Sequence, residues 1–250
     1  MRLSGTFAVV TGASSGIGQA VAERLASMGC QLLLVGRNPD RLHEVARRTG
    51  GEPVVADLEN PDALADLAAR LAKLQPAPDL LINNAGIGRV GSVSEPDGHH
   101  FERLLAVNLR APVTLTQAVL PAMLERGRGH LVFVSSIAAM LGVAREAGYA
   151  AGKAGLHVFA ASVHAEVAQA GIGVTTVVPG IVDTDFFARR GTPYPRRFPR
   201  PLPPARIADA LIKAVERERV EVIVPRWLRV PVALRALAPT TYARLAGRWG

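Results

Sequence analysis

The sequence predicts an α/β protein, a single doubly wound domain in which a parallel sheet of about seven strands is flanked by helices. Short apolar runs rich in β-branched residues alternate with segments of helical periodicity over most of the 250 residues. The runs are apolar throughout rather than at every second position, which is typical of strands buried on both faces of a parallel sheet. Because parallel strands need crossover connections, the alternation predicts right-handed βαβ units.

The order of the elements follows from these runs. We expect strands at residues 7–10, 31–35, 53–56, 80–82, 130–135, 173–178 and 221–224. The segments between them are expected to form helices at residues 17–28, 39–48, 61–74, 100–125, 149–170 and 204–218. No linker interrupts this series, so residues 1–225 are predicted to form one catalytic domain with residues 184–204 as its lid loop. The proline-rich part of that loop, residues 192–204, is too polar and broken for a helix or strand.

Composition excludes several classes of protein. Hydrophobic residues make up 49% of the chain and charged residues 20%, unlike a disordered or collagen-like protein. The single cysteine, Cys30, has no partner for an internal disulfide, so we expect a small core residue in a cytoplasmic protein. We expect no signal peptide and no spanning helix, since the first strand begins at residue 7 and no run reaches about 18 apolar residues.

Charge is distributed unevenly along the chain. The formal net charge of +8 suggests, taken globally, nucleic acid, an anionic membrane or acidic ligands. Residues 1–188 carry 15 basic and 17 acidic side chains, whereas residues 189–250 carry 14 basic and 4 acidic ones. The tail at residues 226–250 is expected to form short amphipathic helices at 232–238 and 241–249. Such a tail suits an anionic membrane surface, a partner or another subunit, and it lacks a recognised nucleic-acid-binding motif.

A glycine-rich turn joins the first strand to the first helix. It reads Thr-Gly-Ala-Ser-Ser-Gly-Ile-Gly over residues 11–18. Glycines allow the tight curvature and close approach that a pyrophosphate needs, while the helix N-terminus turns its N–H groups toward the anion. The strand–turn–helix context predicts a dinucleotide site, although an ordinary βα turn also uses glycine. The candidate contacts are Gly12, Ser14, Ser15, Gly16, Ile17 and Gly18.

The end of the second strand predicts which dinucleotide binds. NAD-selective sites place an acidic side chain there, but this chain has Arg37. Its guanidinium would pair with a 2′-phosphate through charge-assisted hydrogen bonds, so we expect NADP(H) to be preferred over NAD(H). The alternative is an exposed arginine beside the helix cap Asn38. After the third strand, Asp57 and Leu58 would lie near the adenine or simply begin the next helix.

Three side chains form the candidate reacting centre. Tyr149 and Lys153 are four residues apart at the start of a predicted helix, so they share one face. Ser136 closes the strand 130–135 at the carboxyl edge of the sheet, where ligands bind in such folds. An ammonium beside a phenol stabilises its phenolate, and Lys153 stands out because only three of the 29 basic residues are lysine. Taken alone, a solvated Tyr/Lys pair would give the same spacing.

Together these motifs resemble the short-chain dehydrogenase/reductase family, in its compact single-domain, Rossmann-type branch, over residues 6–225. The matching pieces are Thr-Gly-Ala-Ser-Ser-Gly-Ile-Gly (11–18), Asn-Asn-Ala-Gly (83–86), Asn108, Ser136, Tyr-Ala-Ala-Gly-Lys (149–153) and Pro-Gly (179–180).

The resemblance implies roles for the matched residues. Tyr149 would be the general acid/base and Ser136 would orient the substrate carbonyl. Lys153 would hold the nicotinamide ribose and lower the pKa of the tyrosine, while Asn108 would support a water in a proton relay. Further cofactor contacts would come from Asn84, Ala85, Gly86, Pro179, Gly180, Ile181 and Thr184.

The function expected from this reading is interconversion of a carbonyl and an alcohol by hydride transfer with NADP(H). The alternatives are a 3-oxoacyl-thioester reductase and, in another class, a non-catalytic NADP-binding regulator or scaffold. The family resemblance implies a homo-oligomer, either a dimer or a tetramer. We expect a small-molecule substrate, no nucleic acid partner and contact of the tail 226–250 with the inner face of a membrane as one option.

Other residues receive simpler interpretations. The histidines 99, 100, 157 and 164 show no ligand spacing, so no metal site is predicted. Asp183 and Asp185 are interpreted as caps of a following helix. The lid arginines would bind an anionic substrate such as an acyl thioester on a phosphopantetheine carrier, or form a solvated basic loop; they are Arg189, Arg190, Arg196, Arg197, Arg200 and Arg206.

Overall fold

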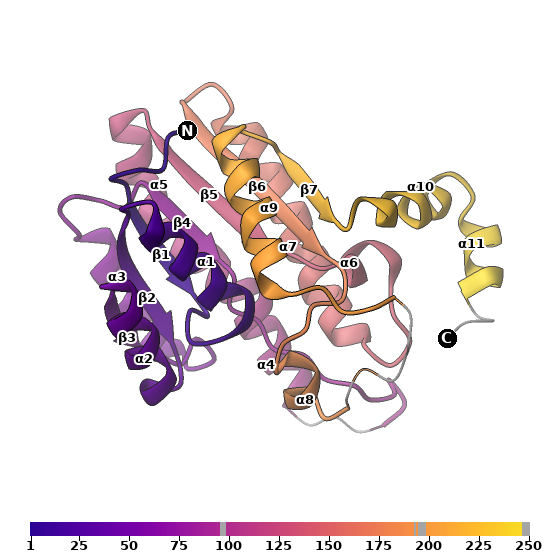
Figure 1. Ribbon diagram of the computed structural model, residues 1–250. Coiled ribbons are helices and arrows are strands. Elements are labelled where there is room, and N and C mark those ends of the chain that lie inside the picture. Colours follow the sequence, from indigo (N-terminus) through magenta and orange to yellow (C-terminus); the bar gives the residue numbers. More distant parts are fainter. Residues whose placement is uncertain (96–98, 193, 195–198, 247–250) are drawn as a thin grey trace.

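Seven strands, parallel in every neighbouring pair, form the central sheet (Figure 1). A computed structural model describes residues 1–95, 99–192, 194 and 199–246. The strands are β1 (Phe7–Thr11), β2 (Gln31–Gly36), β3 (Glu52–Val55), β4 (Leu80–Asn83), β5 (Gly129–Val134), β6 (Ile172–Pro179) and β7 (Glu221–Val224). Their spatial order is β3-β2-β1-β4-β5-β6-β7, so the direction of winding reverses between β1 and β4. The predicted doubly wound, Rossmann-type fold is confirmed.

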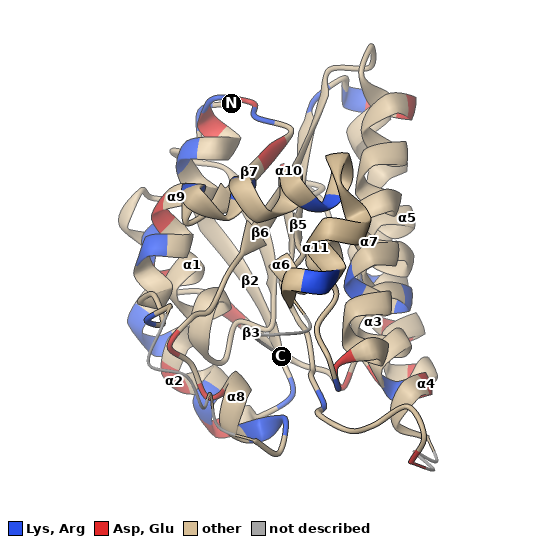
Figure 2. Cartoon of the chain, turned by 90° about the vertical axis from the view of Figure 1, so that its right-hand side faces the viewer, with Lys and Arg blue, Asp and Glu red and all other residues tan. Residues whose placement is uncertain are grey.

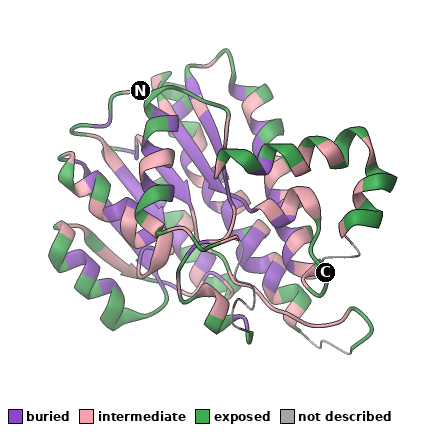
Figure 3. Ribbon diagram, turned by 45° about the vertical axis from the view of Figure 1, so that its right-hand side comes forward, coloured by how far each residue is buried: buried purple, intermediate pink, exposed green. Residues whose placement is uncertain are grey.

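Two layers of helices cover the sheet. One face packs against α1 (Gly16–Ser27), α2 (Pro39–Thr49) and α9 (Pro204–Glu216). The other face packs against α3 (Pro61–Ala72), α5 (Ala111–Arg126) and α7 (Ala147–Val167). Because both faces are covered, successive residues of one strand enter opposite cores, which is why the strands are apolar throughout (Figure 3).

The predicted helix at residues 100–125 is one helical rod interrupted by a wide turn. It consists of α4 (His100–Leu105), a π-helical turn (Ala106–Arg110) and α5. The backbone N–H of Ala111 bonds to the carbonyl of Ala106, five residues back. Pro112 has no N–H to offer the carbonyl of Asn108, four residues before it, so regular α-helical bonding fails at this point. The interruption lies at a predicted site residue.

The predicted lid, residues 184–204, contains a short helix and is anchored to the body at its base. Its first part contains a short helix, α8 (Phe186–Arg189), and a parallel bridge joins Val182 to Leu202 at its base. Asp183 N donates to Leu202 O at 2.8 Å, and Leu202 N donates to Ile181 O at 2.8 Å. Of the predicted basic cluster, Arg196 and Arg197 lie outside the described residues.

The tail leaves the body after β7. A short 3₁₀ turn (Arg226–Leu228) leads into α10 (Arg229–Leu237) and α11 (Pro239–Ala246), which project beyond the sheet edge (Figure 1). Two helices were predicted here, at 232–238 and 241–249; α10 begins three residues earlier, and residues 247–250 lie outside the described chain. In the part of the chain that the structure describes, no helix is long and apolar enough to cross a membrane.

Candidate active site

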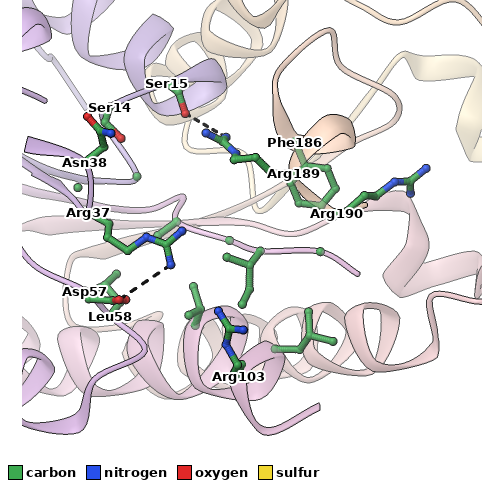
Figure 4. A pocket seen from close by; sticks show the side chains of 18 of the residues that line it. Ser14, Ser15, Arg37, Asn38, Asp57, Leu58, Arg103, Phe186, Arg189 and Arg190 are labelled. Carbon is green, nitrogen blue, oxygen red and sulfur yellow. Dashed lines mark hydrogen bonds and ion pairs between the residues drawn. The ribbon is translucent and has the colours of Figure 1, made fainter. Parts of the chain in front are cut away.

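A cleft of about 410 Å³ opens at the carboxyl ends of β1 to β4, next to the switch in winding (Figure 4). Ligands of doubly wound folds bind at this position, since the loops on either side diverge there. The cleft gathers part of the predicted cofactor set, and these residues are Gly12, Ser14, Ser15, Arg37, Asp57, Leu58, Ala85 and Gly86.

The lining of the cleft is strongly basic. Among the described residues that line the cleft, Asp57 is the single acidic side chain, and the arginines are Arg37, Arg89, Arg103, Arg189 and Arg190. Arg37 Nη1 lies 3.9 Å from Asp57 Oδ2, and Arg103 Nε lies 2.6 Å from Glu59 Oε1. A cleft with this excess of arginine suits a ligand carrying several negative charges.

The glycine-rich turn is held tightly at the floor of the cleft. Asn84 Nδ2 donates to Thr11 O at 2.9 Å, and Thr11 Oγ1 accepts the N–H groups of Asn84 and Ala85, each at 3.0 Å. A Cβ at Gly18 would lie 2.2 Å from Gly12 O and 2.5 Å from Asn84 Nδ2, so only glycine fits. Asn84 therefore fixes the shape of the turn, and its predicted contact with a cofactor stays a prediction.

Several predicted cofactor contacts stand around the cleft without lining it. Gly16 packs against the methyl of Thr184, and the Gly180 N–H donates to Val224 O at 2.7 Å. The residues in this group are Gly16, Ile17, Gly18, Asn84, Pro179, Gly180, Ile181 and Thr184. Their contacts with a cofactor stay predictions.

The three predicted reacting groups meet at the carboxyl end of β5. Ser136 caps the short helix α6 (Ile137–Leu141), where its hydroxyl accepts Ala138 N at 3.1 Å, and it also hydrogen-bonds Tyr149. Lys153 Nζ donates to Val134 O at 2.8 Å, and Ser135 Oγ donates to Lys153 O at 3.1 Å. These last two bonds fix the register of α7 on β5 and bring Tyr149 beside Ser136.

Burial sets the protonation of both titratable groups. It raises the pKa of Tyr149 to about 12, against a smaller lowering by the hydrogen bond from Ser136. It lowers the pKa of Lys153 to about 8. Desolvation is the largest influence on the pKa of Tyr149, and the ammonium of Lys153 bonds to Val134 O; the predicted lowering of the tyrosine pKa by Lys153 stays a prediction. Tyr149 is therefore a protonated phenol at neutral pH, the form that donates a proton.

Asn108 sits in the π-helical turn and pairs with the backbone after β4. Its Nδ2 donates to Ile87 O at 2.9 Å, and its Oδ1 accepts Ile87 N at 3.1 Å. A Cβ at Gly86 would lie 3.0 Å from Asn108 Oδ1 and 3.1 Å from Lys153 Nζ. Asn108 thus holds the β4 loop close to Lys153, and its part in a proton relay stays a prediction.

The structure adds one residue whose role the sequence did not indicate. Phe186 of α8 packs on the ring of Tyr149, with ring centroids 5.4 Å apart, and its ring also touches Gly88. Nothing in the sequence pattern showed that an aromatic side chain of the lid covers the phenol. Asp185 occupies the N-cap position of α8, but its side chain makes no capping bond; Phe186 N donates instead to Thr184 Oγ1 at 3.3 Å.

Cys30 and His157, for which no catalytic or metal-binding role was predicted, make contacts within the protein. Cys30 is buried in the core under α1 and α2, and its thiol donates to Leu3 O at 3.0 Å. His157 Nε2 lies 3.4 Å from Glu221. Within the described ranges, no three His, Cys, Asp or Glu side chains gather in a way that would hold a metal ion.

Known proteins share this fold and are similar to this chain in sequence. The family model described as short chain dehydrogenase matches residues 6–194. The mouse protein named dehydrogenase/reductase SDR family member 7B is 32% identical, over 95% of this chain and 79% of its own. A short-chain dehydrogenase from Sphingobium yanoikuyae, solved in complex with NADPH, superposes with a TM-score of 0.84 at 30% identity, covering 94% of this chain and 95% of that one.

A further solved structure shares the fold at lower identity. It is a short chain dehydrogenase/reductase from Burkholderia phymatum in complex with NAD, with a TM-score of 0.85 at 24% identity, covering 94% of each chain. The match of the family model to most of the chain, together with the mouse relative, places this chain among oxidoreductase enzymes. It belongs to the short-chain dehydrogenase/reductase family.

Proposed function

We propose that this protein interconverts a carbonyl compound and an alcohol with NADP(H), and that Tyr149 is its general acid/base. The observation that carries the proposal is the meeting of Tyr149, Ser136 and Lys153 beside an arginine-lined cleft. The residues present fit a dinucleotide. Gly18 lies so close to Gly12 that the turn carries no side chain there, as a turn that a pyrophosphate approaches closely requires, and the lining of the cleft is basic. Bound NADPH would supply the hydride.

The side chains around the phenol suit the reduction of a carbonyl. The hydroxyl of Ser136 accepts Ala138 N and donates its proton to Tyr149, and the hydroxyl can turn that proton to a substrate oxygen bound beside the phenol. Tyr149 remains protonated up to high pH and can transfer its proton to that oxygen. Lys153 carries its charge below about pH 8 and supports the phenolate that forms.

Arg37 supports a preference for NADP(H). It lies at the end of β2 on the wall of the cleft, and its ion pair with Asp57 is long, at 3.9 Å. A 2′-phosphate would accept both prongs of its guanidinium, which a neutral ribose hydroxyl does not match. The similar Sphingobium protein is described in complex with NADPH, whereas the more distant Burkholderia protein is described with NAD.

The test is the variant Tyr149→Phe, assayed for NADPH oxidation with a panel of ketones, quinones and 3-oxoacyl thioesters. We expect turnover to fall by about a hundredfold or more, because the proton donor is lost, with NADPH affinity nearly unchanged. Tyr242→Phe on α11 removes a phenol far from the site and serves as the matched control. Undiminished turnover in Tyr149→Phe would refute the assignment. A wild-type protein that binds NADPH but reduces no substrate would instead support the scaffold alternative.

Two features outside the cleft support proposals on assembly and location. Val158 on α7 is 64% exposed and Leu124 on α5 is 43% exposed, which suits a dimer or tetramer formed through these helices.

We also propose that the tail touches an anionic membrane surface. On α10 and α11 the charged side chains are arginines (Figure 2), and Val230 and Leu237 stand out at 71% and 87% exposure.

A further inference from the structure

The short lid helix α8 bridges two sides of the cofactor cleft. Its preceding residue Asp185 accepts from Arg41 Nη1 on α2 at 2.7 Å. At its other end, Arg189 Nη2 donates to the hydroxyl of Ser15 at 3.2 Å (Figure 4). Ser15 is the N-cap residue of α1, within the glycine-rich turn, and its hydroxyl makes no capping bond in that helix. The lid is thus joined directly to the glycine-rich turn.

The two neighbouring lid arginines have different environments. Arg190 is buried, pairs with Glu146 and packs over the ring of Phe187, with its guanidinium carbon 4.6 Å from the ring centroid. Arg189 is half exposed, and its nearest carboxylate, Asp185, is 4.0 Å away and already bonded to Arg41. Arg190 therefore anchors the lid, whereas the charge of Arg189 is left poorly compensated and faces the cleft.

Two guanidinium groups of the cleft lining, those of Arg37 and Arg189, lie close enough to interact, and Arg41 on α2 adds a third positive charge near Arg189. Burial lowers the pKa of Arg189, Asp185 opposes this, and the positive charges of Arg41 and Arg37 lower the pKa further. Arg37 and Arg189 both line the cleft, one from the end of β2 and one from the lid. Two like charges held beside the same cavity cost free energy until an anion enters between them.

We propose that Arg189 is a second ligand of the 2′-phosphate of the cofactor, reaching it from the lid while Arg37 reaches it from the sheet. This inference rests on the proposed NADP(H) function and assigns part of its specificity to a residue 152 positions away in the chain. A phosphate dianion between the two guanidinium groups replaces their repulsion with charge-assisted hydrogen bonds. Ser15, one of the predicted cofactor contacts, then serves as the resting partner of Arg189 and is released when the phosphate binds.

The binding of adenosine 2′,5′-bisphosphate and 5′-AMP, measured by calorimetry, tests this without any catalytic step. Arg189→Gln should weaken binding of the bisphosphate about tenfold or more and leave that of 5′-AMP nearly unchanged. Arg189→Lys keeps the charge without the fork and should recover part of the loss. Arg200→Gln removes an exposed arginine of the same lid that does not line the cleft, and it should bind both nucleotides like the wild type.

The outcomes separate this inference from the proposed function. If Arg37→Gln weakens the bisphosphate selectively but Arg189→Gln does not, the lid contact is refuted and the NADP(H) preference stands. Equal losses for both nucleotides in Arg189→Gln also overturn the inference, because the 2′-phosphate would then not be the group that Arg189 reads. If the wild type binds both nucleotides equally, the cofactor preference itself fails.

Discussion

The ring of Phe186 lies against the ring of Tyr149, with their centroids 5.4 Å apart and their planes inclined by 51°. This contact joins the lid to the proposed proton donor and leaves the tyrosine only 8% exposed. The same four-residue helix carries Arg189, which contacts the glycine-rich turn. Access to the phenol and the outer end of the cofactor cleft are therefore controlled by one short segment.

Phe186→Ala should widen the range of substrates. The aromatic ring occupies the space beside the phenol, so its removal makes room for bulky groups on the carbonyl carbon. We expect the ratio of kcat/KM for a diaryl ketone to that for a small aliphatic ketone to rise about tenfold, in line with the discrimination that a hydrophobic wall provides. Phe101→Ala, which truncates a half-exposed aromatic of α4, is the control. An unchanged ratio would mean that the lid opens fully before substrate binds.

Gly18→Ala should destabilise the protein. The added methyl would lie 2.2 Å from Gly12 O and 2.5 Å from Asn84 Nδ2, and neither the turn nor the asparagine can retreat without losing hydrogen bonds. We expect the free energy of unfolding in urea to fall by about 1–3 kcal/mol, as overpacking usually costs, and cofactor affinity to fall with it. At Gly91 an added Cβ meets its nearest atoms at 3.7 Å, so Gly91→Ala should change stability by less than about 0.5 kcal/mol.

The protein should lose stability in mild acid through His130. Burial lowers the pKa of this histidine to about 4, and its Nε2 pairs with Thr175 Oγ1 at 2.8 Å. The unfolded chain therefore binds more protons than the folded one between about pH 6.5 and pH 4, so stability falls as pH falls through that window. The loss attributable to this residue is about 3 kcal/mol.

Urea denaturation at a series of pH values would measure this loss. The neutral variant His130→Gln should show a flatter dependence on pH than the wild type, whatever its stability at pH 7. His43→Gln, on the exposed face of α2, should keep the wild-type slope. Equal slopes in wild type and His130→Gln would contradict the role given to His130.

Binding of the tail to anionic vesicles should depend on its exposed arginines. Replacing Arg229 and Arg244 by Gln should weaken flotation with phosphatidylserine vesicles by about tenfold or more, at about 1 kcal/mol for each charge near the surface. Deleting residues 226–250 is a less specific test, because it also removes Leu228, which is buried against Val178 and Ile223. The paired control replaces Lys213 of α9 and Arg217, the residue after α9, by Gln. Unchanged flotation of the tail variant would eliminate the membrane proposal.

The fold could be predicted from the sequence, and candidate site residues proposed, because both predictions depend on local patterns. Uninterrupted apolar runs predicted a sheet covered on both faces, and all seven strands form within about one or two residues of their expected bounds. Three local patterns predicted candidate site residues that the structure brings to the carboxyl edge of the sheet. They are the turn at residues 11–18, Arg37 at the end of the second strand, and the spacing of Tyr149 and Lys153. Such patterns can be recognised from residues close together in the sequence, and the common direction of parallel strands then brings their carboxyl ends to the same edge of the sheet.

Tertiary structure decided what depends on distant segments. The π-helical turn at Asn108 precedes Pro112, but which loop its amide holds follows from the packing of that helix on the β4 loop. The pKa of Tyr149 rises instead of falling because burial under Phe186 and the surrounding core outweighs any nearby charge. The sequence by itself determined the family and the fold, and it predicted the reacting groups; only the tertiary structure placed Arg189 beside Ser15 and Phe186 over Tyr149, because a lid's position is set by contacts with residues far away in the chain.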